Sequence, residues 1–492
     1  MKNQNRIFQI VIIGLYLVTF LVISINILQK NLWFDESVQF WISKGLNPDS
    51  NPLSPVGNVI DVIENNKHYN MDPGGFGILL HYWSMLSNNI IWLRLLPFIF
   101  FIGIVLSFIY LSYVWMKNLS IALLMGFIPI LYPMILNMGF EVRAYSMETL
   151  GAVLCVIAID QLTKRIDYKS LIFWACIFSL FITSRYSLII VVFVASLFIL
   201  YLIFKEKIPL KKRLLSAMIY SIPLILSLCY IYFFALVYQN VNIEPLSYLP
   251  YLSKNPFLLI SPFNFLYISS IGICSILFFA KNKYQFLKKY EFLLFFTVAV
   301  NILFIVLSFM GKHPWSPTSN RCISMVVLMV ICFSAFIGEL LKPLFNTKDV
   351  TKYYLLSFIL IFIIYERKGN LLSRYGNDMN TYFNFRKVDI NQFDKIYVDR
   401  WESPYIKYLF EYGKLKDEIG KTYPNKFTFK KAMRHGFYDG KVTLEEYYLK
   451  QPKMNELTNY DLLITPELFS QGNNDKWILL DKTTNFWIKR DK

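Results

Sequence analysis

The sequence predicts a polytopic α-helical membrane protein followed by a C-terminal extracytoplasmic α/β domain. Of its 492 residues, 55% are hydrophobic and 18% are aromatic, which is typical of repeated membrane spans and not of one soluble core. After residue 365 the chain becomes polar and stays so to its end. We therefore expect a membrane domain over residues 1–365 and a second domain over residues 366–492.

The apolar runs define the expected spans. Residues 7–29 are long enough to cross a bilayer and lack the cleavage site of a signal peptide, so we expect an uncleaved first span. With the runs that follow, about eleven spans are expected. The later ranges are 95–115, 119–138, 146–162, 170–184, 187–204, 214–237, 263–280, 291–310, 322–341 and 353–365. The run at 76–86 is about half a span long and predicts an outer juxtamembrane helix.

Basic residues orient these spans, because cytoplasmic loops carry an excess of lysine and arginine. Lys2 and Arg6 place the N-terminus inside, and the later inner loops are lysine-rich, whereas the outer loops are poor in basic residues. The loop at 30–92 and the domain at 366–492 are then outside. The net charge of +17 reflects this topology and contact with membrane lipids, not nucleic acid. We expect a multi-pass protein of the cytoplasmic (inner) membrane.

The C-terminal segment has the pattern of a folded α/β domain. Alternating apolar residues predict strands at 395–399, 461–465, 477–480 and 486–489, of which the last two form a hairpin. Helical spacing predicts a helix at 403–412.

Ionisable residues gather on the expected outer side. They are Asp35 and Glu36 after the first span, Glu141, Arg143 and Tyr145 after the third, Arg185 after the fifth, and Arg321 before the tenth. Arginine binds phosphate oxygens through paired donors, and a carboxylate can accept the proton of a hydroxyl or amine nucleophile. Together these groups suit a lipid-phosphate substrate. With no P-loop and no GxGxxG after a strand, a sugar donor would have to be lipid-linked.

Each group also has a structural explanation. Asp35 and Glu36 would cap and charge the first turn of a helix. Arg143 would snorkel to the interface with a surface partner, Glu141. Arg185 would anchor in lipid headgroups. The six cysteines show no CxxC spacing, so no zinc site is expected.

Five motifs in order resemble the membrane-integral glycosyltransferases of the GT-C class, in particular the protein O-mannosyltransferase and lipid A aminoarabinose transferase branch (glycosyltransferase family 39-like). The motifs are WFDES at 33–37, the juxtamembrane DPGGFGILLHYW at 72–83 with Asp72 and His81 and the WLR at 92–94 that follows it, FEVRAYS at 140–146, TSRY at 183–186 and NRCI at 320–323. Two departures are that Asp72-Pro-Gly stands where the family has His-Pro-Pro, and that Cys322 replaces a tyrosine.

The resemblance implies a GT-C fold and an inverting sugar transfer from a polyprenyl-phosphate donor to a protein, lipid A or cell-surface glycan. Asp35 would be the general base, with Glu36 and Glu141 positioning it or the acceptor. The lipid phosphate would be bound by Arg143, Tyr145, Arg185 and Arg321. No cofactor is required; oligosaccharyl relatives use a divalent cation, for which Asp35 and Glu141 are candidate ligands.

Two other functions stay open. A transporter or flippase for a lipid-linked solute would place ionisable residues near the bilayer midplane. An O-antigen-type polymerase or ligase would also use lipid-linked glycans on this face. The identities of the sugar and of the acceptor are not specified by the sequence.

Overall fold

The computed structural model describes residues 2–27, 32–47, 56–239, 250–280, 285–346, 356, 392–398, 403–412, 427–429, 459–464, 477–481 and 484–489. Their contacts divide the chain into two compact units. Unit 1 comprises Met1–Ser24, Pro97–Phe233 and Glu244–Leu371, and unit 2 comprises Ile25–Leu96, Phe234–Ile243 and Leu372–Lys492.

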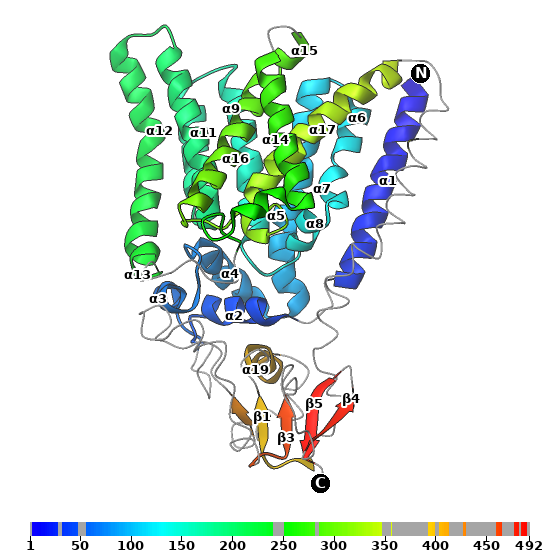
Figure 1. The fold of residues 1–492 in the computed structure, drawn as a ribbon, viewed down its shortest axis with the longest axis vertical. Coiled ribbons are helices and arrows are strands. Elements are labelled where there is room, and N and C mark those ends of the chain that lie inside the picture. Colours follow the sequence, from blue (N-terminus) through cyan, green and yellow to red (C-terminus); the bar gives the residue numbers. More distant parts are fainter. Residues whose placement is uncertain are drawn as a thin grey trace. The chain divides into compact units, whose positions relative to one another are not determined.

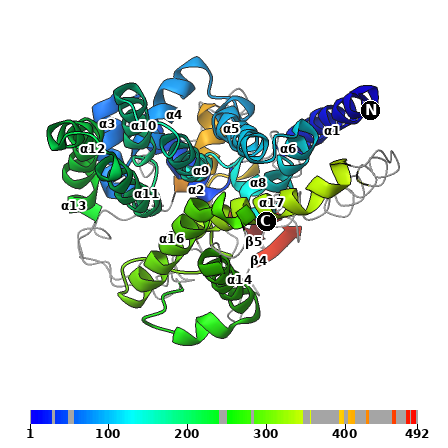
Figure 2. The ribbon, with the colours of Figure 1, turned by 90° about the horizontal axis from the view of Figure 1, so that it is seen from above.

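Unit 1 is a bundle of helices in its described part (Figures 1 and 2). The helices are α1 (Lys2–Ile27), α5 (Ile90–Met116), α6 (Leu119–Met125), α7 (Ile128–Leu131), α8 (Pro133–Met138), α9 (Tyr145–Leu162), α10 (Tyr168–Phe181), α11 (Tyr186–Lys205), α12 (Leu210–Ile231), η2 (Pro256–Ile260), α14 (Pro262–Ala280), α15 (Gln285–Lys288), α16 (Glu291–Phe309), η3 (Asn320–Cys322) and α17 (Ile323–Asn346). After α12 the chain continues through the π-helical η1 (Tyr232–Leu236) into α13 (Val237–Gln239). The end of α1, the start of α5 and all of α13 belong to unit 2.

Within the described residues, 7 helices are long and apolar enough to cross a membrane, as in a polytopic helical membrane protein. They are Ile90–Met116, Tyr145–Leu162, Tyr186–Lys205, Leu210–Gln239, Pro262–Ala280, Glu291–Phe309 and Asn320–Phe345. Each falls on a span that the sequence predicts. The full set of about eleven predicted membrane spans is not confirmed. The apolar helices Arg6–Val22, Leu119–Leu131 and Tyr168–Phe181 are shorter, and the predicted span 353–365 lies outside the described residues apart from residue 356.

The prediction of one continuous helix over residues 119–138 is wrong. The structure has three short helices there, α6, α7 and α8. Pro129 lies in the first turn of α7, and Pro133 begins α8. Proline has no amide hydrogen, and its ring clashes with the turn before it, so a helix begins at a proline more readily than it continues through one.

Helix α9 is the most enclosed of the seven long helices, with 83% of its apolar window buried. It packs against α10, α11 and α17 and lies among them in Figure 2. The windows of Leu210–Gln239 and Pro262–Ala280 are only 22% and 17% buried. A helix surrounded by protein can carry polar groups, because its neighbours supply their partners. Helix α9 accordingly carries the buried carboxylates of Glu148 and Asp160.

Unit 2 contains helices and a five-stranded sheet. The elements are α2 (Phe34–Ser43), α3 (Val59–Tyr69), α4 (Gly75–Leu86), α19 (Ser403–Glu411), β1 (Ile396–Val398), β2 (Phe427–Phe429), β3 (Leu462–Ile464), β4 (Trp477–Asp481) and β5 (Thr484–Lys489). The strand order is β2-β1-β3-β5-β4. Strand β1 is parallel to both neighbours, with Ile396 opposite Phe427 and Leu462, whereas β5 is antiparallel to β3 and β4.

Strands β1, β3, β4 and β5 and helix α19 lie where the sequence predicts them, and the last two strands form the predicted hairpin. Strand β2 is not among the predicted strands. Helix α4 has 12 residues and coincides with the predicted juxtamembrane helix.

The division into units differs from the predicted domain boundary at residue 365, because residues 25–96 group with residues 372–492. Helices α2 and α19 make this connection. The indole of Trp41 donates a hydrogen bond to the carbonyl of Pro404 at 2.8 Å, and the Phe40 and Tyr408 ring centroids are 5.2 Å apart.

Candidate functional site

The adjacent acids Asp35 and Glu36 begin helix α2 but have different surroundings. Glu36 is fully buried, and its Oε2 accepts hydrogen bonds from Nη2 of Arg94 at 2.8 Å and from the backbone N–H of Trp33 at 3.1 Å. It therefore satisfies an amide at the start of the helix and neutralises a buried guanidinium. Asp35 is partly exposed. Of the two carboxylates, only Asp35 is partly accessible to solvent.

Asp72 and His81 hold the polypeptide around α2 and α3. The buried His81 ring donates from Nδ1 to the carbonyl of Ser43 at 2.7 Å, at the C-terminal end of α2. The backbone carbonyl of Asp72 accepts hydrogen bonds from the side-chain amides of Asn66 (2.8 Å) and Gln239 (3.2 Å). His81 thus satisfies one of the carbonyls that a helix end leaves without an intrahelical partner.

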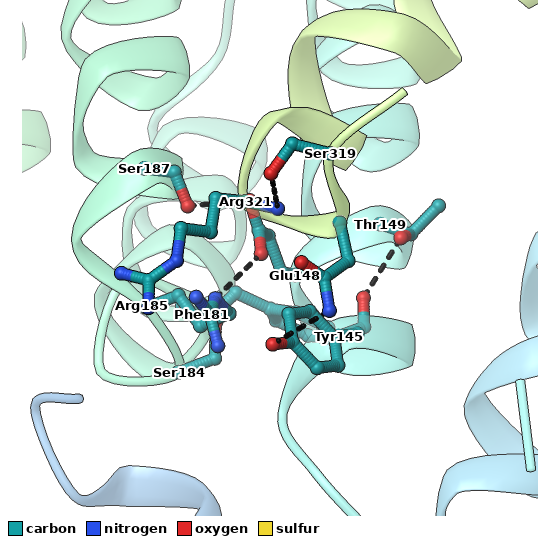
Figure 3. Close-up of polar contacts among 10 residues, drawn as sticks. Tyr145, Glu148, Thr149, Phe181, Ser184, Arg185, Ser187, Ser319 and Arg321 are labelled. Atoms are coloured by element: carbon teal, nitrogen blue, oxygen red, sulfur yellow. Dashed lines mark hydrogen bonds and ion pairs between the residues drawn. The ribbon is translucent and has the colours of Figure 1, made fainter. Parts of the chain in front are cut away.

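A second group of predicted residues meets in unit 1 around a carboxylate that the sequence analysis did not single out (Figure 3). Glu148, in the first turn of α9, is fully buried. Its Oε2 lies 3.0 Å from Nε of Arg185, the residue just before α11. Its Oε1 accepts a hydrogen bond of 2.5 Å from the hydroxyl of Ser187. The pair joins the beginnings of α9 and α11.

Tyr145 connects this pair to the start of α17. The guanidinium carbon of Arg185 lies 4.2 Å from the centroid of the Tyr145 ring, a cation–π contact. The Tyr145 hydroxyl accepts a hydrogen bond of 3.0 Å from the side-chain amide of Asn320, in the short helix η3. Met138, Tyr145 and Ile323 form an apolar cluster beside it. The structure therefore brings Tyr145, Arg185 and Arg321 into one neighbourhood, as Figure 3 shows.

Arg321 is the cation of this group that is available to a ligand. Its side chain is partly exposed, and among the residues that the structure describes it has no acidic partner. Its backbone N–H donates a hydrogen bond of 3.3 Å to the hydroxyl of Ser319. This bond orients the turn before α17. A guanidinium without a carboxylate partner is a ready binding group for phosphate.

His313 lies in the loop between α16 and η3. Burial lowers the pKa of His313 to about 4, and the positive charges of Arg185 and Arg321 act in the same direction. The imidazole is therefore neutral at pH 7, with Nδ1 donating to the carbonyl of Pro314 at 2.7 Å. Its ring packs edge-on against Phe304.

Glu141 and Arg143 lie in the bend between α8 and α9. The Arg143 amide donates to the Glu141 carbonyl at 2.6 Å. Glu141 is buried, so it is not the surface partner that the snorkelling explanation requires, whereas Arg143 is partly exposed. Burial of a carboxylate is costly unless neighbouring groups compensate it.

Three helix N-termini meet at this cluster, those of α9, α11 and the η3–α17 segment. Each N-terminus carries a partial positive charge from its aligned peptide dipoles. Arg185 and Arg321 add two full positive charges, and the buried Glu148 offsets one. The surplus of positive potential favours an anion such as a phosphate group.

The sequence analysis missed Glu148, and it identified Arg94 only as part of a motif, not as the partner of Glu36. Glu148 lies near the start of a predicted span, and an acid within an apolar run is a signal for function or pairing. Arg94 lies near the start of the apolar helix α5, so it is also a charged residue at the edge of an apolar run. Neither partner is close in sequence to the residue it contacts, so the pairing itself carries no local signal.

Among the described residues, no group of three or more His, Cys, Asp or Glu side chains is arranged to hold a metal ion. The candidate ligands Asp35 and Glu141 belong to unit 2 and unit 1, respectively. In comparisons with known proteins, no family model and no curated protein matches this chain.

Proposed function

We propose that this protein is a membrane glycosyltransferase of the GT-C class, which moves a sugar from a polyprenyl-phosphate donor to an acceptor on the outer face of the cytoplasmic membrane. The observation that carries the proposal is Arg321, a cation without an acidic partner among the described residues, beside Arg185 at the N-terminal ends of apolar helices. A phosphate that carries a long apolar chain complements such a site, because the arginines bind the phosphate while the chain contacts the apolar helices.

In this proposal Arg321 and Arg185 bind the donor phosphate, and Arg143 in the neighbouring loop assists them. Tyr145 holds the Arg185 guanidinium in place through its ring. As the bond between the anomeric carbon and the phosphate oxygen breaks, its electron pair passes to the phosphate, and the guanidinium groups stabilise that charge. Polyprenyl phosphate paired with cations is already a good leaving group, so the scheme requires no metal ion.

The resemblance to GT-C enzymes assigns the general-base role to Asp35. The acceptor oxygen or nitrogen forms the new bond to the anomeric carbon and loses its proton to the Asp35 carboxylate. The partial exposure of Asp35 supports this role, and the burial of Glu36 against Arg94 argues for a supporting one. Glu141 would position the acceptor.

Charge also supports the side on which the reaction takes place. The ends of α9 and α11 opposite the arginine cluster carry Lys164 and Lys205, and lysine-rich ends favour the cytoplasm. The arginine cluster, and by the same topology residues 366–492, would then be extracytoplasmic. Sugar nucleotides are cytoplasmic, so a lipid-linked donor follows.

The test uses membranes that contain the full-length protein and a panel of polyprenyl-phosphate sugars labelled in the sugar. We expect one donor to release free polyprenyl phosphate as label enters an endogenous acceptor, and Arg321→Gln to reduce this release. Lys312→Gln, a change at an exposed lysine in the preceding loop, is the matched control. Movement of intact donor across sealed vesicles without release would contradict the proposal and favour a transporter.

A further inference from the structure

A large cavity of unit 1 lies at the end of the bundle opposite the arginine cluster. It has a volume of about 1120 Å³ and is lined by residues from α5, α9, α11, α14, α15 and α16. Lys205, the last residue of α11, lies on its wall, whereas Arg185 precedes the first residue of the same helix. A helix of this length spans about 30 Å, so the cavity is separate from the site described above.

The lining of this cavity is mainly apolar. Aromatic side chains from three helices line it, namely Phe193, Phe198, Phe278, Phe292 and Phe295. Phe193 and Leu197 also belong to the exposed apolar surface of α11. The cavity is larger than the roughly 300–1,000 Å³ of sites for drug-sized ligands, so it suits a long apolar chain better than a single ion.

The rim of the cavity is cationic. Lys117, Lys205 and Lys288 lie on it, are exposed, and have no acidic partner among the described residues. The other two lining lysines are compensated, because Lys164 pairs with Asp160 and Lys289 pairs with Glu339 at 2.6 Å. Glu291 also lines the cavity, so the three positive charges, which come from three separate elements, exceed the one remaining carboxylate of the lining.

We propose that this cavity binds an anionic phospholipid, with its phosphate at the three unpaired lysines and an acyl chain between the aromatic walls. The apolar walls exclude a soluble anion as the main ligand, because it would leave them hydrated. The cationic rim disfavours a zwitterionic lipid, whose choline group would be repelled. Basic residues on this side of a membrane protein attract the anionic lipids of the cytoplasmic leaflet. The inference is independent of the glycosyltransferase proposal.

The experiment measures lipid binding to the purified full-length protein in detergent by native mass spectrometry. Phosphatidylglycerol and phosphatidylcholine are titrated separately against the wild-type protein and a triple variant, Lys117→Gln, Lys205→Gln and Lys288→Gln. Each lysine near a membrane surface contributes about 1 kcal/mol, so we expect the apparent Kd for phosphatidylglycerol to rise at least tenfold in the triple variant. Binding of phosphatidylcholine should be weaker in the wild type and should not change.

The matched control is Lys207→Gln, Lys211→Gln and Lys212→Gln, which removes the same charge after α11 and in the first turn of α12 without touching the cavity lining. A second variant, Ala299→Trp, fills the cavity from α16 and should weaken phosphatidylglycerol binding with all lysines in place. Equal losses in the triple variant and its control would overturn the proposal. Displacement of the lipid by millimolar inorganic phosphate would overturn it as well, because it would indicate a site for a free anion.

Discussion

Oε2 of Glu36 lies 2.8 Å from Nη2 of Arg94, and neither side chain is exposed to solvent. This ion pair separates the roles of two adjacent acids that the sequence presents as equals. Removing one partner of a buried pair leaves the other charge uncompensated, which is far more costly than losing a surface ion pair.

Glu36→Gln should therefore destabilise the protein while keeping the shape of the side chain. We expect a loss of about 3–5 kcal/mol, because the Arg94 guanidinium would stay buried without its counter-charge. The measurement is thermal unfolding in detergent. Asp35→Asn is the matched control and should cost less, about 1 kcal/mol, because it removes a charge from the first turn of α2 without leaving Arg94 uncompensated. Equal effects of the two variants would contradict the distinction.

Asp35→Asn should instead abolish transfer, because the amide cannot accept the acceptor's proton. The expected reduction in kcat is about 10²–10⁴-fold, the usual contribution of a general base. The assay is donor-dependent release of polyprenyl phosphate, with the melting temperature recorded on the same samples. Normal turnover by a folded Asp35→Asn protein would sink the assignment.

Arg321 and Arg185 should respond differently to substitution. Arg321→Gln removes a cation that has no acidic partner among the described residues, so we expect loss of transfer, by about tenfold or more, without loss of stability. Arg185→Gln removes the partner of the buried Glu148 and should lower the melting temperature as well. The measurements are the donor KM and the melting temperature of the two variants. Restoration of donor KM by Arg321→Lys would show that charge matters more than the planar guanidinium.

His313 should make stability depend on pH. Its pKa is about 4 in the folded protein, below its ordinary value of 6.5. The unfolded chain therefore binds the proton more readily, so this stabilisation is complete above about pH 6.5 and is lost as the pH falls toward 4. At pH 5 the loss is up to about 2 kcal/mol.

The measurement is the melting temperature in detergent between pH 7 and pH 5. His313→Asn keeps a donor for the Pro314 carbonyl but cannot titrate, so its melting temperature should fall less over this range. Parallel curves for the variant and the wild type would show that other groups account for the acid sensitivity.

The positions of the membrane helices follow closely from the sequence, because the length and composition of an apolar run are local properties. Helix α9 spans Tyr145–Leu162, against a predicted 146–162, and α16 ends at Phe309, against a predicted 310. The interruption within 119–138 coincides with Pro129, in the first turn of α7, and Pro133, the first residue of α8. Proline alone does not predict such a break, because α5, α12 and α17 continue through Pro97, Pro223 and Pro343.

The partners of the charged residues did not follow from the sequence. Tyr145, Arg185 and Arg321 were predicted as a group because each lies at the same expected end of a span. The carboxylate that organises them, Glu148, was read as part of a span. Its pairing depends on which helix packs beside α9, and no periodicity encodes that choice.

The sequence alone predicts a polytopic helical membrane protein, the ranges of its apolar helices, and the acids and arginines that are available for chemistry. Only the folded chain distinguishes Asp35, which remains accessible, from Glu36, which is buried against Arg94. The physical reason is that helix formation depends on neighbouring residues, whereas burial and charge compensation depend on segments that folding brings together from distant parts of the chain.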